Sequence, residues 1–228
     1  MLWRELLKEG ADFPSGRFFR HRVVLVYKGD PPEVCPVCES NERRYHVHGS
    51  FLRWFVTLVG RKIERVRLRK PRFKCLICTH TFSLHPPEGL SYKHTCNFLI
   101  VVFLWSYLAS TAGMHRALPA EFSEDVSPRT VSRYLKSAKA VAVVTQQFIR
   151  EALIERTEPR PIEEIFSGGL DPPESLLKKQ RAEPEKASTL WRALAMLFQG
   201  AKALNEDPRT LLAWANQRSQ NRKRRFLL

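Results

Sequence analysis

Two close pairs of cysteines are the residues of this chain best suited to chemistry. The pairs are Cys35-Pro-Val-Cys38 and Cys75-Leu-Ile-Cys78, and 36 residues separate them. A Cys-x-x-Cys segment can form a tight knuckle that turns both sulfurs toward one point, so two knuckles present four thiolates around a tetrahedral ion. Zinc prefers this soft ligand set, and four protein ligands leave no position for a reacting water. We therefore predict a structural Zn²⁺ site at these four cysteines.

Two disulfides, free cysteines in a core and an iron–sulfur cluster are the alternatives to zinc. The chain shows no export signal, which favours metal over disulfides. The pairs also lack the tighter ligand clustering that is usual for iron–sulfur proteins. The fifth cysteine, Cys96, has no nearby cysteine in the sequence, and we expect it in a core. Four histidines are expected at the surface or beside the ligands: His46, His48, His80 and His85.

Positive charge is densest in the segment that leads into the second cysteine pair. Arg61 and Lys62 open a run in which arginine recurs at every second residue, at Arg65, Arg67 and Arg69. Because side chains alternate along a strand, these three arginines share one face and the residues between them face the core. Three adjacent arginines repel one another unless an anion lies opposite, and the planar guanidinium suits phosphate. The run predicts a phosphate-binding strand; a solvated strand face is the alternative.

A second basic surface is expected on a helix that begins after Ser127. Ser127 and Pro128 are typical of a helix start, and apolar residues follow at helical spacing from Val131 to Ala142. The opposite face carries Arg129, Ser132, Arg133 and Lys136. This layout is typical of the recognition helix of a helix-turn-helix, whose polar front enters the major groove of DNA. A surface helix of a bundle is the alternative.

The composition favours a nucleic acid as the partner. The 228-residue chain carries a net charge of +15, with a pI near 10.0. Such a charge attracts polyanions, either nucleic acid or an anionic membrane surface. The basic run resembles a strand rather than an amphipathic membrane helix, which favours nucleic acid. The longest apolar run, Phe98 to Leu108, is too short to span a bilayer, so we expect a buried helix, no membrane partner and a cytoplasmic protein, nucleoid-associated if bacterial.

The fold class expected is α+β. A zinc ribbon of small antiparallel strands with an N-terminal extension would occupy residues 1–92, with a strand over 20–27 and strand-like pieces broken at Gly49 and Gly60. A helix-turn-helix-like region would follow over 93–157, with supporting helices at 97–110 and 114–122. Residues 158–187 are expected to be a proline-rich linker. Residues 188–228 would form a C-terminal helical pair with a basic tail, its helices capped by Ser188 and Asp207.

An ordered series of these motifs resembles the N-terminal region of insertion-sequence transposases and related small zinc-ribbon proteins. The resemblance covers roughly residues 30–140. Its matching segments are Cys35-Pro-Val-Cys38, residues 45–50, Gly60-Arg-Lys-Ile63, the basic strand, residues 72–78, residues 81–84 and Ser127-Pro-Arg-Thr-Val131. In that family the ribbon and the helix-turn-helix recognise transposon-end DNA, while a separate RNase-H-like domain cuts it.

This chain departs from the family in two ways. The glycine that often follows each knuckle is replaced by Glu39 and Thr79. The cutting domain, which needs three carboxylates on a sheet, also has no counterpart, because only Asp125, Asp171 and Asp207 are aspartates after residue 30. The resemblance therefore implies recognition of DNA but not its cleavage.

The function expected is zinc-dependent binding of duplex DNA by a regulatory or transposon-associated protein that is not an enzyme. An RNA-binding or assembly module with structural zinc is one alternative. A nuclease or transposase with an unrecognised active site is another, although the chain has no Walker, zinc-protease or serine-elbow motif. The C-terminal helices could bind a protein partner or a second copy of the chain.

Overall fold

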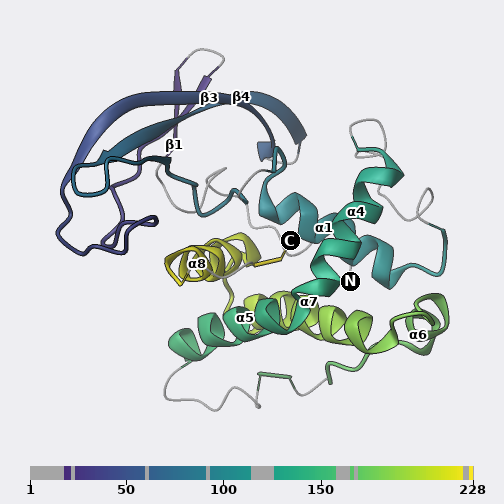
Figure 1. The fold of residues 1–228 in the computed structure, drawn as a ribbon. Helices are drawn as coiled ribbons and strands as arrows, with labels where there is room; N and C mark the ends of the chain where they lie inside the picture. Colours follow the sequence, from purple (N-terminus) through teal and green to yellow (C-terminus); the bar gives the residue numbers. More distant parts are fainter. Residues whose placement is uncertain are drawn as a thin grey trace. The chain divides into compact units, whose positions relative to one another are not determined.

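The computed structural model contains two compact units, which are divided between Cys96 and Asn97. The first unit is built around a β-sheet and the second from helices, so the chain is α+β, as predicted (Figure 1). The structure describes residues 18–21, 24–59, 62–90, 93–113, 126–157, 165–166, 169–222 and 226–227.

The sheet is mixed rather than purely antiparallel. Its strands are β1 (Phe18–His21), β2 (Val24–Tyr27), β3 (Tyr45–Val59), β4 (Lys62–Cys75) and β5 (Thr81–Ser83). They lie in the order β1-β2-β4-β3, with β5 also paired to β4. The prediction of a small antiparallel ribbon is wrong at one place, because β2 runs parallel to β4, with Leu25 opposite Leu68. The first knuckle and all of β3 lie in the connection that this parallel pair requires.

The predicted strand over residues 20–27 is two strands. β1 and β2 pair antiparallel, with His21 opposite Val24. The segment has no glycine, proline or asparagine to mark a reversal, so its composition gave no sign of one.

The predicted break at Gly49 is a bulge inside a continuous strand. β3 and β4 form a long curved antiparallel pair (Figure 1). The register shifts between Val47 and Ser50, and Gly49 has a φ of 86°, which a residue with a Cβ adopts only at a cost. Gly60 lies outside the described residues.

The helical unit is packed from five long helices and one short one among the described residues. They are α1 (Asn97–Ala109), α4 (Pro128–Ala140), α5 (Ala142–Thr157), α6 (Glu174–Lys179), α7 (Pro184–Ala203) and α8 (Pro208–Asn221). The apolar run in α1 is a buried helix, as predicted. Helices α5 and α7 lie side by side (Figure 1), and Gly200 of α7 faces the end of the Leu153 side chain of α5, where an added Cβ would come within 2.4 Å.

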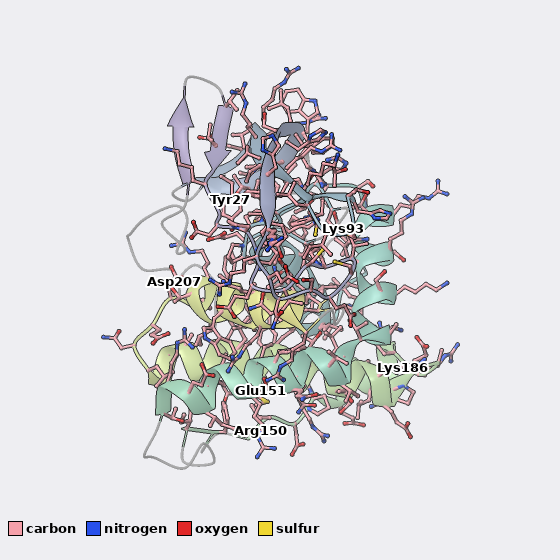
Figure 2. All side chains as sticks on the ribbon, turned by 60° about the vertical axis from the view of Figure 1, so that its left-hand side comes forward. Tyr27, Lys93, Arg150, Glu151, Lys186 and Asp207 are labelled. Carbon is pink, nitrogen blue, oxygen red and sulfur yellow. The ribbon has the colours of Figure 1, made fainter. Side chains whose placement is uncertain are left out.

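The helix starts confirm some predictions and correct others. Asp207 caps α8, accepting from the backbone N–H of Arg209 at 2.8 Å (Figure 2). Ser188 caps nothing, because α7 begins one turn earlier with Pro184 at its first position, where proline is favoured. The segment predicted as a linker contains α6. The helix predicted at 114–122 lies outside the described residues.

Candidate metal centre and basic surfaces

The four predicted metal ligands converge on one point. The sulfur atoms of Cys35, Cys38, Cys75 and Cys78 all lie within 4.8 Å of one another. The closest contacts join the two knuckles, with 3.9 Å between Cys35 Sγ and Cys78 Sγ and 3.9 Å between Cys38 Sγ and Cys75 Sγ. A tetrahedral ion with Zn–S bonds of about 2.3 Å would place its sulfurs about 3.8 Å apart. The spacing therefore fits a four-coordinate metal and is about twice the length of a disulfide bond.

The two knuckles have the same backbone geometry. Glu39 and Thr79, the residues that follow each pair, both have a φ of 62°, in the left-handed region where glycine is favoured. The N–H of Cys35 donates to the carbonyl of Ser40 at 2.8 Å, and the N–H of Cys75 donates to that of His80 at 2.9 Å. Both knuckles therefore adopt the left-handed conformation that glycine favours, although neither position is a glycine.

Backbone amides in the second knuckle favour a thiolate. The pKa of Cys75 falls to about 7, chiefly because the Cys78 N–H donates to its sulfur, with a further contribution from the Ile77 N–H. In the first knuckle the Ser40 N–H acts in the same direction on Cys38, but burial and the three other thiols outweigh it and raise the pKa of Cys38 to about 11. The thiolate is the form in which cysteine binds a metal.

The knuckles are held against the sheet by strand pairing and aromatic packing. Tyr45 at the start of β3 lies opposite Cys75 at the end of β4. Its ring packs edge-on against Phe73 and Phe82, with centroids 6.5 and 5.5 Å away. The N–H of Leu76 donates to the carbonyl of Arg44, the residue before β3, at 2.9 Å. The second knuckle is therefore fixed to both long strands.

The basic strand has the predicted alternation. Arg65, Arg67 and Arg69 are exposed, while Val66 and Leu68 are buried. Side chains that end in nitrogen gather over β3 and β4 (Figure 2). No ion pair among the described residues involves any of the three arginines. We refer to these three residues as the arginine row.

Trp54, which no sequence pattern singled out, lies beside the arginine row. It is opposite Arg67 on the neighbouring strand and is 43% exposed. The guanidinium carbons of Arg65 and Arg67 lie 5.0 and 5.1 Å from its ring centroid, within cation–π range. The alternation of side chains along β3 could have predicted that Trp54 is exposed. Its arginine partners could not be predicted, because they depend on the register between β3 and β4.

The inner face of the sheet holds further basic residues in a structural role. Lys70 is 3% exposed and donates to Nδ1 of His85 at 3.3 Å. Burial, followed by the charge of Lys70, lowers the pKa of His85 to about 4, so the ring is neutral and can accept. Burial likewise lowers the pKa of Lys70 to about 8. A guanidinium nitrogen of Arg53 donates to the carbonyl of Lys93, so this face packs beneath the chain that follows β5.

The helix predicted as basic and amphipathic is α4. Ser127 caps it and accepts from the backbone N–H of Thr130 at 3.3 Å, and Pro128 occupies its first turn. Val131, Tyr134 and Leu135 are buried. Its exposed residues include the predicted set of Arg129, Ser132, Arg133 and Lys136, which form no ion pair among the described residues. Its packing partners include α1 and α7, so the helix-turn-helix itself remains a prediction.

A second tryptophan with two arginines lies in the helical unit. Trp214 of α8 has the guanidinium carbons of Arg156 and Arg218 at 5.5 and 4.9 Å from its ring centroid. Both arginines are paired with carboxylates, Arg156 with Glu206 at 3.2 Å and Arg218 with Glu155. The charges of this cluster are therefore neutralised within the protein.

The remaining predicted residues have simpler placements. Cys96 is buried, as expected for a core residue. Lys62 begins β4, and Arg61 lies outside the described residues. His46, His48 and His80 are exposed, and His80 Nδ1 lies 2.9 Å from the Cys78 carbonyl oxygen beside the metal ligands.

The chain matches no family model, no curated protein and no solved structure. The resemblance to transposase zinc ribbons therefore stays a prediction. Within the described part of the chain, no helix has the length and apolar character needed to cross a membrane.

Proposed function

We propose that this chain is a DNA-binding protein whose sheet unit is held together by a structural zinc ion. The proposal is carried by one observation: three arginines without a carboxylate partner among the described residues lie side by side on a strand that ends in the metal ligand Cys75. A rigid row of unneutralised guanidinium groups suits a row of phosphates.

Zinc is the metal proposed for the four cysteines. All four ligands are sulfur, their spacing fits a tetrahedral ion, and such a site has no open position for a substrate. The ion would cross-link the ends of β3 and β4 through the two knuckles and would hold the arginine row in place. It would take no part in a reaction, and we propose a binding protein rather than an enzyme.

The exposed face of α4 is proposed as a second DNA contact. Its basic residues and Ser132 face away from the buried side of the helix, as those of a recognition helix do. Lys139 is the exception, since it is 11% exposed and pairs with Glu183 at 2.6 Å. A regulatory or transposon-associated role would agree with this arrangement and with the resemblance noted in the sequence.

The test is binding of labelled random-sequence duplex DNA by the metal-quantified protein across a salt series. We expect affinity to fall steeply as salt rises, with a log–log slope of about −3 or steeper if the arginine row contacts phosphates. Cys75→Ser should lose both the metal and the binding, whereas Cys96→Ala should keep both. A protein that holds its metal but binds neither duplex nor single-stranded DNA at low salt would contradict the proposal.

Variants of α4 test the second contact. Arg133→Gln combined with Lys136→Gln should weaken duplex binding about tenfold and reduce the salt slope by up to about 2. Lys139→Gln is the matched control, because its charge is already paired, and it should leave binding unchanged. If the two variants change the affinity for DNA equally, α4 is not part of the DNA-binding surface.

A further inference from the structure

The arginine row contains a feature that phosphate binding alone does not require. Trp54 is 43% exposed beside the middle residue of the row, Arg67, and exposed Leu52 lies on the same face of β3, opposite Arg69. Leaving a large aromatic side chain in water forfeits the hydrophobic stabilisation that its burial would provide. A surface that only had to attract phosphates would be served by lysine or arginine alone.

The contacts around Trp54 hold the guanidinium groups in position. Arg67 lies directly opposite Trp54 across the strand pair, and Arg65 lies on the diagonal. Both guanidinium carbons are about as far from the ring centroid as in favourable cation–π pairs. The result is a platform in which one indole ring and two planar cations are grouped on a sheet face.

The strands around Trp54 make this platform broad. β2 runs along the other side of β4, with Val24 beside Arg67 and Val26 beside Arg69. Val24 and Val26, which are half-buried, therefore border the arginine row on the side away from Trp54. Three strands form a continuous surface here, which is wider than the two-stranded ribbon that the major groove of duplex DNA admits.

We propose that the arginine row and Trp54 bind a single-stranded segment of nucleic acid, with an unpaired base stacked on the platform and neighbouring phosphates held by the arginines. This proposal rests on the proposed function and specifies the class of nucleic acid that the sheet unit takes. In a duplex both faces of every base are covered by its neighbours, so an aromatic platform gains little from it. In a single strand the base faces are free, and stacking on aromatic and guanidinium groups is the usual way that proteins bind them.

The test compares nucleic acids that share a sequence and differ in their exposed bases. The full-length, metal-loaded protein is titrated with a labelled single-stranded DNA oligonucleotide, the RNA of the same sequence, the duplex, and a single strand in which several bases are replaced by abasic sites. We expect the intact single strand to bind about 10- to 100-fold more tightly than the abasic strand, although both carry the same phosphates. The DNA and RNA arms show which single strand is preferred, and tight binding of either supports the proposal.

Variants of the platform separate stacking from charge. Trp54→Leu should weaken single-strand binding about tenfold or more with an unchanged salt slope, and Trp54→Tyr should restore much of it. Arg67→Gln should lower the slope by about 0.7, while Arg218→Gln in the helical unit, the matched control, should leave it unchanged. The abasic comparison uses the unaltered protein, so it decides the matter even if a Trp54 variant fails to fold.

Two negative results have different meanings. If duplex and single strand both bind, but abasic sites and Trp54→Leu leave single-strand affinity unchanged, stacking is excluded and the proposed DNA binding stands. If no nucleic acid binds at low salt, the proposed function fails and this inference fails with it.

Discussion

The two clusters of one tryptophan and two arginines differ in how their positive charges are balanced. In the helical unit, Trp214 is accompanied by Arg156 and Arg218, and each of these arginines has a glutamate partner. In the sheet unit, Trp54 is accompanied by Arg65 and Arg67, and neither forms an ion pair with a described residue. The same side chains thus form a self-contained structural contact in one unit, and in the other a cationic surface that no described carboxylate neutralises.

This difference separates a packing role from a binding role. Exposed guanidinium groups repel one another, and a protein that needs them only for packing can supply carboxylates, as the helical unit does. A row without such partners is stabilised when an anion arrives from outside. The arrangement of charge, rather than the presence of arginine and tryptophan, is the reason why we propose the sheet unit as the nucleic-acid-binding site.

The two units also differ in what holds them together. Among the described residues, the largest fully buried side chains lie mostly in the helical unit, and only Phe55 and Leu68 belong to the sheet unit. A unit with a small apolar core gains stability from a further cross-link, and the four-cysteine cluster supplies a site that could hold one.

The largest expected effect follows from removing the metal. Cys75→Ser, or a strong chelator, should unfold the sheet unit, because zinc binding to such modules contributes on the order of 10 kcal/mol to folding. The helical unit should keep its cooperative thermal transition. Circular dichroism and heteronuclear NMR spectra would show loss of the strand signals with the helix signals retained. If the sheet unit stays folded without metal, the two units do not differ in what holds them together.

Removing the arginine row should affect binding much more than stability. The triple variant Arg65→Gln, Arg67→Gln and Arg69→Gln should bind nucleic acid about 100-fold more weakly at low salt, because three phosphate contacts are lost. Its free energy of unfolding should fall by no more than about 1–2 kcal/mol, because two exposed cation–π contacts with Trp54 are lost. Salt-dependent binding and urea titrations measure the two quantities. A large loss of stability with unchanged affinity would assign the row a structural role.

A smaller effect is expected at the left-handed residues of the knuckles. Glu39→Gly removes the steric cost of a φ of 62° and should stabilise the sheet unit by roughly 1 kcal/mol, less the entropy that glycine adds to the unfolded chain. Thr79→Gly should behave alike because its φ is the same. The midpoint of thermal unfolding of the metal-bound protein reports the change. A marked loss of stability in both variants would show that the side chains themselves support the knuckles.

The smallest effect is expected from the partners of Trp214. Glu155→Gln should cost the helical unit about 0.2–1 kcal/mol, because the Arg218–Glu155 pair is largely exposed and screened by solvent. Glu155→Gln together with Glu206→Gln would leave two unneutralised arginines beside a tryptophan and should introduce weak, salt-sensitive oligonucleotide binding. If the double variant binds the oligonucleotide no more tightly than the unaltered protein does, then removing carboxylate partners is not enough to create a binding surface. The contrast between the two units would then need another explanation.

The features that the sequence predicted correctly depend on neighbours in the chain. The cysteine pairs, the alternation of Arg65, Arg67 and Arg69, and the Asp207 cap follow from local spacing and are all present. The buried helix at α1 likewise follows from its apolar composition.

The features that the sequence did not reveal depend on contacts between distant residues. Trp54 meets Arg67 only because the register of β3 against β4, with its bulge near Gly49, places them opposite each other. The parallel pairing of β2 with β4 and the pairing of Arg218 with Glu155, 63 residues away, leave no local pattern either. The start of α7 at Pro184 was missed because Ser188 offered an equally plausible cap.

The central claim is that Arg65, Arg67 and Arg69, which form no ion pair with a described residue, bind nucleic acid. It is tested most directly by NMR of the arginine side-chain Nε–Hε groups in the zinc-loaded protein during titration with an oligonucleotide. We predict that the signals of Arg65, Arg67 and Arg69 shift and become protected from exchange with water, while those of Arg156 and Arg218 stay unchanged. Shifts confined to the helical unit, or no shift in the arginine row at saturating oligonucleotide, would contradict this account.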